Sequence, residues 1–546
     1  MPMRESTNQP PPLAGHDAFA DDTALMEALH REGAGWAQEE LHALGTLAGS
    51  AEAKAWGRLA NTYEPVLHTH DRYGDRRDEV EFHPAYHDLM RTAVSHGLHA
   101  APWADERPGA HVARAAKLQV WVAVEAGHGC PITMTYAAVP ALRAQPEIAA
   151  EWEPRLVSRV YDPRFRPASE KHGALLGMGM TERQGGSDVR ANTTRAEPLG
   201  AGGPGGEYAL TGHKWFFSAP MCDGHLVLAQ ASGGLSCFLV PRWLPDGARN
   251  SLRLQRLKDK LGNRSNASSE VEFDRAWGRL IGEEGRGVAT IIEMVGHTRL
   301  DCVIGSSAGM RLGVAEAVHH AAHRRAFGRE LIDQPLMRNV LADLALESEA
   351  ATTLAMRLAR AYDAQQDAAE NAFKRLATAV AKYWICKRAP AHAAEALECL
   401  GGDGYVEDSP MPRLLRESPL NGIWEGSGNV ICLDVLRAMR RDPETVEAFF
   451  AEVGAAAGAD ARLDIEVAAL RDEVADTETL EVRARRVVER MALVLQASLL
   501  VRHGHPAIAD AFVVSRVAGD HGGAFGTLPA GSDAGTIIER ARPKLN

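Results

Sequence analysis

The sequence predicts a mostly helical protein with a small β-barrel in its middle. Apolar residues recur every three or four positions before about residue 172 and after about residue 286, which is the spacing of amphipathic helices. Between these limits the sequence changes to Gly, Ser and Thr with short apolar runs, which is typical of strands joined by turns. A stretch of about one hundred residues of this kind suffices for a small antiparallel sheet or barrel.

The chain has 546 residues, enough for three or four domains at roughly 150 residues each. We expect an N-terminal helical domain over residues 1–172, a β-barrel domain over 173–285, a four-helix bundle over 286–440 and a helical C-terminal extension over 441–546. The segment Arg440-Arg441-Asp442-Pro443 marks the joint before the extension.

Each part contains segments with the expected periodicity. The N-terminal helices are expected at Ala24–Arg31, Trp36–Leu47 and Val112–Ala126. The strands are expected at Tyr208–Leu210, His225–Ala229, Ser236–Val240 and Glu270–Phe273. The bundle helices are expected at Asp301–Arg325, Asn339–Asp363 and Asp367–Glu398, and the extension helices at Pro443–Val453, Arg462–Val474 and Leu480–Leu500.

Charge, hydropathy and cysteine usage exclude several classes of protein. Lys and Arg number 60 against 72 Asp and Glu, so the whole molecule is not a general polyanion binder, and nucleic-acid binding needs a local basic patch. The longest apolar stretch, Met491–Val501, is too short to span a bilayer, and we expect no signal peptide at the start of the chain. The seven cysteines include no C-x-x-C pair. We therefore expect reduced thiols, no metal site, no membrane contact and a cytoplasmic location.

Three segments carry residues suited to chemistry. Gly177–Val189 is rich in Gly and short hydroxyl side chains, which can bring backbone N–H groups close to a flat ring or a phosphate, although such a loop can also be a plain turn. Gly212–Ser218 places Trp215 in a strand, where an isolated aromatic is more often part of a core. In Ile423–Val430, Glu425 stands between a Trp and a Gly-Ser-Gly turn. A water-poor setting there would favour a base for a carbon-bound proton, whereas the alternative is a carboxylate at a helix start.

Together these segments resemble the acyl-CoA dehydrogenase family of flavoproteins. Further stretches that are similar to the family's motifs are Lys260–Ser265, Ile281–Gly287, Arg324-x-x-Phe327-Gly328 and Gly401–Tyr405. The motif sequences are even more similar to those of the alkylation-response branch of that family, the AidB-like proteins. The likeness to that branch is strongest at Arg31–Trp36, Cys130–Thr135, Met178–Val189, Leu257–Ala267 and Trp424–Asn429, and it weakens after about residue 440.

The resemblance implies the family fold, which consists of a helical domain, a β-barrel and a four-helix bundle. It also implies that FAD lies between the barrel and the bundle. We expect the protein to be a homo-oligomer, and specifically a tetramer. The positions it assigns to the cofactor are Met178, Gly179, Met180, Thr181, Gly186, Ser187, Trp215, Phe216, Phe217, Ser218, Gly426, Ser427 and Asn429. Those assigned to the cofactor of a neighbouring subunit are Arg324, Phe327, Gln334, Gly401 and Gly402. The chain departs from the family at Phe217, where Thr is usual, at Glu398, where Gln is usual, and at Gln334, one residue before the usual Gln.

The resemblance also places the catalytic base at Glu425. It would remove the α-proton of an acyl thioester while the cofactor accepts the β-hydride. Some members of the family carry the base in a Glu-Arg pair on the bundle. Here Thr298-Arg299 stands at that position, so acyl-CoA chemistry would depend on Glu425. Arg437 in the following helix either crowds the acyl pocket, as in AidB-like proteins, or lies outside it.

AidB-like proteins are associated with double-stranded DNA binding through the extension, with protection against alkylating agents and with weak activity on short branched acyl-CoAs. Residues 441–546 hold 12 Lys and Arg against 17 Asp and Glu, a poor balance for a polyphosphate ligand unless the cations are segregated. The candidates for such segregation are Arg483, Arg486 and Arg490 on one helical face, and Arg540, Arg542 and Lys544 at the end. Three readings stay open: a DNA-binding flavoprotein that detoxifies or blocks alkylating agents, an ordinary acyl-CoA dehydrogenase with a structural extension, and a flavin-binding protein without turnover.

Overall fold

The computed structural model describes residues 8–545, and the chain forms two compact units. One unit consists of Met1–Lys54, Pro108–Val124 and Arg299–Asn546, and the other of Ala55–Arg107 and Glu125–Thr298. We call them the helical unit and the barrel unit. The segment before residue 125 contributes to both units, so the division into four domains stays a prediction.

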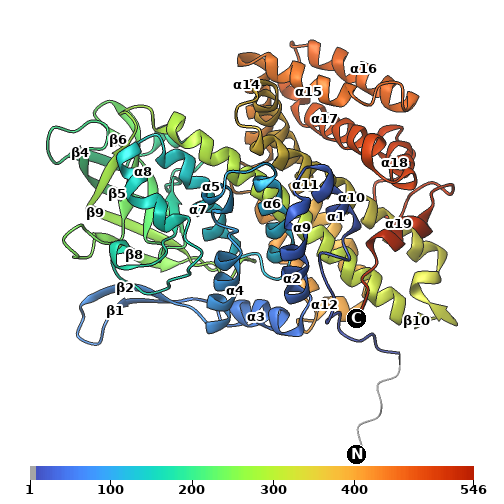
Figure 1. Cartoon of the computed structure of the whole chain (residues 1–546), viewed down its shortest axis with the longest axis horizontal. Helices are drawn as coiled ribbons and strands as arrows, with labels where there is room; N and C mark the ends of the chain where they lie inside the picture. The colour runs from blue at the N-terminus through green and yellow to red at the C-terminus, as the bar shows by residue number, and fades with distance from the viewer. Residues whose placement is uncertain (1–7, 546) are drawn as a thin grey trace, which may run out of the picture. The chain divides into compact units, whose positions relative to one another are not determined.

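The barrel unit contains a closed β-barrel, drawn mainly in green in Figure 1. Five strands close it in the order β6-β4-β5-β9-β7, because β7 pairs back with β6. Two more strands extend the sheet: β3 runs parallel to β6, and β8 is antiparallel to β9. The strands are β3 (Leu176–Gly179), β4 (Arg195–Pro198), β5 (Glu207–Ser218), β6 (Gly224–Ala231), β7 (Gly234–Pro241), β8 (Leu252–Leu257) and β9 (Ser268–Ile281).

The barrel is filled by alternate side chains of its strands, as the period of two requires. Its core includes Tyr208, Phe217, Phe238, Val271 and Phe273, all nearly inaccessible to solvent. The four segments predicted as strands lie inside β5, β6, β7 and β9, and the expectation of a helical protein with a central barrel is confirmed.

Outside the barrel, the regular elements of the barrel unit are helices and one two-stranded ribbon. Its helices are α3 (Ala51–Thr62, beginning in the other unit), α4 (Pro84–Ser95), α5 (Ala101–Ala104), α7 (Gly129–Leu142) and α8 (Pro146–Leu156). The antiparallel ribbon of β1 (Val66–His70) and β2 (Arg76–Glu81) lies in a region expected to be helical. A turn whose Asp71 side chain accepts from the Tyr73 and Asp75 N–H groups joins its two strands.

The helical unit is built on long helices. Its N-terminal part holds α1 (Thr23–Arg31), α2 (Gln38–Ala48) and α6 (Ala110–Val122), and its main helices are α9 (Gly287–His323, beginning in the barrel unit), α10 (Pro335–Asp363), α11 (Ala368–Cys399) and α14 (Gly428–Arg441). Hydrogen bonds connect α9 to α10 and α11. The Ser307 hydroxyl of α9 lies 2.9 Å from the Thr352 hydroxyl of α10, and the Cys386 thiol of α11 donates to the Cys302 carbonyl of α9. The segment Asp301–Arg325, expected to be helical, lies mostly inside α9, which begins soon after β9 because only Gly282–Arg286 separates the two elements.

The C-terminal extension adds α15 (Glu444–Gly454), α16 (Ala461–Ala475), α17 (Leu480–His503), α18 (Pro506–Phe512), a π-helical turn Val513–Val517 and α19 (Ala534–Ala541). It is anchored to α10, because Arg516 forms an ion pair with Glu347 at 3.2 Å and Asn339 donates to the Leu528 carbonyl at 2.8 Å. Within residues 8–545 no helix is long and apolar enough to cross a membrane, and no group of three or more potential ligands gathers for a metal ion.

Candidate functional site

The loop predicted to bind flavin follows β3 and is held by a buried ion pair. Lys214 of β5 lies 2.9 Å from the carboxylate of Glu182, and neither side chain is exposed. Glu182 also accepts from the Thr193 N–H at 2.6 Å and the Thr194 N–H at 3.1 Å. Burial opposes ionisation, but these hydrogen bonds and the Lys214 charge lower the pKa of Glu182 to about 2, and burial lowers the pKa of Lys214 to about 8.

Glu182 thereby fixes the middle of the loop while its neighbours stay accessible. The Trp215 N–H donates to the Thr181 carbonyl at 2.8 Å, which ties the loop to β5. A Cβ at Gly186 would collide with the Thr181 hydroxyl, so only glycine lets the chain fold over this threonine. The Thr181 side chain is half-buried and Ser187 is exposed. The predicted residues Met178 and Gly179 belong to β3 itself.

A β-bulge in β5 separates the aromatic residues of the second motif. Lys214 pairs with Val271 and Phe217 with Ser269, so that two residues, Trp215 and Phe216, stand opposite a single one on β9. Consequently Lys214 and Phe217 both point into the barrel, whereas Phe216 is 51% exposed and Trp215 half-buried.

The position of Phe217 corrects one expectation. Its ring lies in the barrel core at 4.2 Å from the His225 ring, so this side chain is not on the outer surface with Trp215. The bulge causes this, because it reverses the side-chain alternation after Phe216. The Ser218 hydroxyl is half-buried and lies 3.5 Å from that of Ser268.

Cationic side chains surround the Trp215 ring. The Lys258 ammonium lies 3.3 Å from the ring centroid, and the guanidinium groups of Arg183 and Arg256 lie at 5.2 and 5.8 Å. Such contacts orient an indole and polarise its surroundings. The outer face of β5 therefore presents an oriented aromatic ring next to a glycine-rich loop with free hydroxyl groups.

In the helical unit, Glu425 occupies a left-handed turn before α14. Its φ is +58°, a conformation that residues other than glycine rarely adopt. Three consecutive carbonyl groups of this turn accept from cationic side chains: Lys382 donates to Trp424 at 2.8 Å and to Gly426, and Arg299 donates to Glu425 at 3.2 Å. The backbone on both sides of Glu425 is thus fixed from α11 and α9.

The residues after Glu425 begin α14. Ser427 is its N-cap without a side-chain capping bond, and Asn429 accepts from Arg485 of α17 at 2.8 Å. The Trp424 indole donates to Asn421 at 2.8 Å. The structure thus brings together the predicted residues Glu425, Gly426, Ser427 and Asn429 in one turn, with one arginine of the extension beside them.

Arg437 lies on α14 and is 57% exposed at its side chain, 3.7 Å from Asp434. Asp434 also binds Arg299 at 2.6 Å and Arg375 at 3.1 Å, and although burial opposes it, these cations lower the pKa of Asp434.

The residues assigned to a neighbouring subunit lie at exposed turns. Phe327 is 97% exposed, with a φ of +51°, at the tip of the hairpin formed by β10 (Arg325–Ala326) and β11 (Arg329–Glu330). Gln334 donates to the Ala326 carbonyl at 3.0 Å, Arg324 donates to the Asn8 carbonyl, and Gly401 and Gly402 are exposed before α12 (Gly402–Tyr405). The Phe327 side chain is accessible for a contact with another subunit, and the tetramer stays a prediction.

The predicted arginine face of α17 is neutralised by its neighbour α16. All three arginines face Glu473: Arg483 at 3.1 Å, Arg486 at 3.6 Å and Arg490 closer still. Arg490 also binds Glu466 at 2.6 Å. At the end of the chain, Arg540 pairs with Glu27 and Glu349, Arg542 lies 3.6 Å from Glu539, and the Lys544 N–H donates to Asp21.

The structure also shows contacts that the sequence analysis missed, namely the Glu182–Lys214 pair, Lys382 and Arg485. Lys382 had a signal, because it interrupts an apolar run from Ala377 to Cys386 and a lysine there needs buried partners. Glu182 and Lys214 are 32 positions apart and Arg485 lies 56 from Asn429, so no local pattern relates them.

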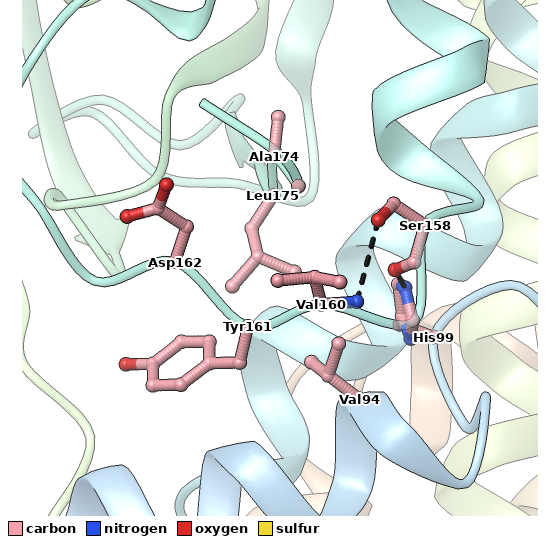
Figure 2. A pocket seen from close by; sticks show the side chains of 9 residues that line it. Val94, His99, Ser158, Val160, Tyr161, Asp162, Ala174 and Leu175 are labelled. Carbon is pink, nitrogen blue, oxygen red and sulfur yellow. Dashed lines mark hydrogen bonds between the residues drawn. The ribbon is translucent and has the colours of Figure 1, made fainter. Parts of the chain in front are cut away.

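A small cavity of the barrel unit lies apart from these residues. Figure 2 shows it between Tyr161, Leu175 and Val94, with Ser158 accepting from the Val160 N–H at 3.3 Å and from His99 at its carbonyl. No predicted site residue lines it.

Comparison with known proteins agrees with these motifs. Three family models match: the adaptive response protein AidB N-terminal domain over residues 8–163, the acyl-CoA dehydrogenase middle domain over 177–276 and the acyl-CoA dehydrogenase C-terminal domain over 285–440. The putative acyl-CoA dehydrogenase AidB of Escherichia coli is 48% identical over 92% of this chain and 93% of its own length. Acyl-CoA dehydrogenase family member 11 of Caenorhabditis elegans is 30% identical over 73% of this chain and 66% of its own.

Among solved structures, Caenorhabditis elegans ACDH-11 in complex with C11-CoA superposes with a TM-score of 0.86 at 26% identity, covering 99% of this chain and 93% of that one. The chain therefore belongs to the acyl-CoA dehydrogenase family, in the branch that carries the AidB N-terminal domain.

Proposed function

We propose that this chain is an FAD-dependent flavoprotein in which Glu425 removes the α-proton of a short or branched acyl-CoA. The observation that carries the proposal is the turn of Glu425, whose left-handed backbone is held by Lys382 and Arg299 at the position of the family's base. A base for a weakly acidic C–H bond acts only from a fixed place. Two buried or half-buried cations supply that rigidity here.

The residues on the outer face of the barrel suit FAD. The glycine-rich loop leaves backbone groups and the Thr181 and Ser187 hydroxyls accessible, and Trp215 presents an oriented ring beside them. A Cβ at Gly186 would close this loop against Thr181. FAD, when bound, would accept the hydride from the β-carbon of the acyl group. Met180, Thr181, Ser187 and Trp215 would hold it from the barrel.

The resemblance to the family also assigns Gly426, Ser427 and Asn429, next to the base in the sequence, to FAD. In a homotetramer, Arg324, Phe327, Gln334 and the Gly401-Gly402 turn would reach the cofactor of a neighbouring subunit. Supporting this is the exposure of Phe327, whose ring is almost entirely accessible in the single chain.

The test compares the wild-type protein with Glu425→Gln, both loaded with FAD. Under anaerobic conditions, excess isobutyryl-CoA should bleach the flavin absorbance of the wild type. Since a general base contributes roughly 10²- to 10⁴-fold, the variant should be slower by about that factor at unchanged FAD content. Equal rates for the two proteins would refute Glu425 as the base, and a wild type that isobutyryl-CoA leaves oxidised would refute this substrate class.

A second candidate function is binding of double-stranded DNA with protection against alkylation damage. The likeness to AidB and to the adaptive response N-terminal domain favours it. The face of Arg483, Arg486 and Arg490 is a poor contact, because Glu473 already pairs with it. We propose Arg440, Arg441 and Arg471 instead. All three are exposed, and none of them forms an ion pair with a residue in the described range 8–545.

Two matched triple variants test this proposal. One replaces Arg440, Arg441 and Arg471 by Gln, and the other Arg483, Arg486 and Arg490. Affinity for a duplex is measured across a salt series, where each phosphate contact contributes about −0.9 to the log-log slope. We expect the first variant to flatten the slope and the second to leave it unchanged. The reverse outcome would restore the α17 face, and no binding at low salt would refute the DNA function.

A further inference from the structure

A lysine buried in α11 contacts the turn that carries Glu425 on both sides of that residue. Lys382 is 1% exposed, and its ammonium donates to the carbonyl groups of Trp424 and Gly426, the residues on either side of Glu425. Within residues 8–545 no carboxylate lies within 4 Å of it. A buried ammonium is costly unless hydrogen bonds compensate it, so these carbonyl groups are its principal partners.

The thiols near Lys382 do not supply a counter-charge. Burial raises the pKa of both Cys302 and Cys386, so the two thiols stay neutral. The Cys386 thiol donates to the Cys302 carbonyl and is thereby occupied. The ammonium is thus directed at the turn.

The position of the two acceptors explains what the contact does. The φ and ψ rotations of Gly426 and, before them, those of Glu425 separate the Trp424 carbonyl from the Gly426 carbonyl. A single donor group that binds both carbonyls restricts these rotations together, including the φ and ψ of Glu425, whose φ is +58°. Since the Cα–Cβ direction follows from these two angles, the same contact aims the Glu425 side chain.

We infer that Lys382 is a positioning residue: it clamps the left-handed turn and thereby aims the carboxylate of Glu425. The inference rests on the proposed function, in which Glu425 is the base. Arg299 adds a third bond to the same turn, but Asp434 shares its guanidinium, whereas Lys382 serves the turn alone. Lys382 touches neither substrate nor cofactor in this scheme.

The main test is Lys382→Met, which keeps the length of the side chain and removes its donors. Lys374→Met on the same helix is the control, because the Lys374 amine lies over the Tyr362 ring, outside the turn. Steady-state rates are measured with isobutyryl-CoA and an artificial electron acceptor at saturating FAD. Misplacing a reacting group by about 1 Å costs about 100-fold. We expect kcat of Lys382→Met to fall by that order while KM changes less than about threefold, and Lys382→Arg, which retains donors for both carbonyls, to recover most of the rate.

Hydrogen exchange of the amides of residues 424–428 in the intact protein provides a readout that does not depend on turnover. We expect faster exchange in Lys382→Met than in the wild type and in Lys374→Met. If Lys382→Met does not fold, Lys382→Gln replaces it with the same expected split between kcat and KM. Wild-type kcat in the variant, or unchanged exchange of the turn, overturns the inference. If the wild type itself lacks turnover but the variant's turn exchanges faster, the proposed substrate fails while the clamp stands.

Discussion

Breaking the buried ion pair between Glu182 and Lys214 should loosen the flavin loop and destabilise the barrel. In Lys214→Met the carboxylate of Glu182 keeps its bonds from the Thr193 N–H, the Thr193 hydroxyl and the Thr194 N–H, but loses its counter-charge in a site with no solvent exposure. Removing one partner of a buried pair costs about 3–5 kcal/mol. The three remaining hydrogen bonds place the expected loss of unfolding free energy near the lower end, at about 3 kcal/mol.

A loss of this size corresponds to a fall of roughly 6–12 °C in the melting temperature of a domain of 150–250 residues. Differential scanning calorimetry measures it, with Arg275→Met as the control, because the exposed pair of Arg275 with Glu197 is worth less than about 1 kcal/mol. The double variant Glu182→Gln/Lys214→Met should recover part of the loss, since it buries no unpaired charge. FAD affinity should fall in Lys214→Met, since Glu182 holds the middle of the loop.

The pH dependence follows from the lowered pKa of Glu182. Its folded-state pKa is about 2 against an ordinary value of 4.5, so its stabilising contribution is complete above pH 4.5 and is lost as the pH falls through about 2. Unfolding by urea between pH 5 and pH 2 should therefore converge for the wild type and Glu182→Gln. A loss below about 1 kcal/mol in Lys214→Met at pH 7, or curves that stay parallel to pH 2, would refute the role of this pair.

Two further predictions concern residues that the sequence analysis singled out. Phe217→Thr, which restores the family's usual residue, should cost about 3 kcal/mol of unfolding free energy and leave the FAD dissociation constant unchanged, because the Phe217 side chain fills the barrel core. Phe216→Thr, on the exposed side of the bulge, should cost less than about 1 kcal/mol. Tighter FAD binding by Phe217→Thr would contradict the placement of this side chain in the core. Glu473→Gln should release Arg486, while Arg483 keeps Asp476 and Arg490 keeps Glu466 as partners. It should steepen the salt dependence of DNA binding by about 0.9 for each arginine that gains a phosphate, and an unchanged slope would show that the released arginine contacts no DNA.

The fold was predictable from the sequence because its strong signals are local. The barrel strands alternate with glycine-rich turns, and the bundle helices are segments of about thirty residues rich in Ala, Leu and other helix-forming residues. The ribbon of β1 and β2 was missed because Val66–His70 and Arg76–Glu81 are short, polar on most positions and flanked by helices. Only Leu67 and Val80 of this ribbon pack on the barrel core, and two apolar side chains are too few to give an alternating pattern in the sequence.

For the candidate site, the motifs predicted which residues lie in the loop and in the turn. They did not predict the direction of each side chain. The bulge at Trp215 and Phe216 sends Phe217 inward, and it arises from pairing with β9 some fifty positions away along the chain. Register of this kind is a tertiary property, so an alignment of motifs places Phe217 beside Trp215 when the two point to opposite sides of the sheet.

Tertiary contacts also decide whether the charged residues of the extension can bind DNA. The numbers of charged residues predicted an acidic segment, and the spacing of its arginines predicted one basic helical face. These arginines do lie on α17. Packing of α16 against it brings Glu466 and Glu473 within ion-pair distance, so the arginines stabilise the extension and lose much of their attraction for a phosphate. A DNA-binding role then depends on cations left unpaired elsewhere, such as Arg440, Arg441 and Arg471. Because the flavin motifs are compatible with every reading, these pairings, and not the motifs, are what separates a DNA-binding flavoprotein from an ordinary dehydrogenase.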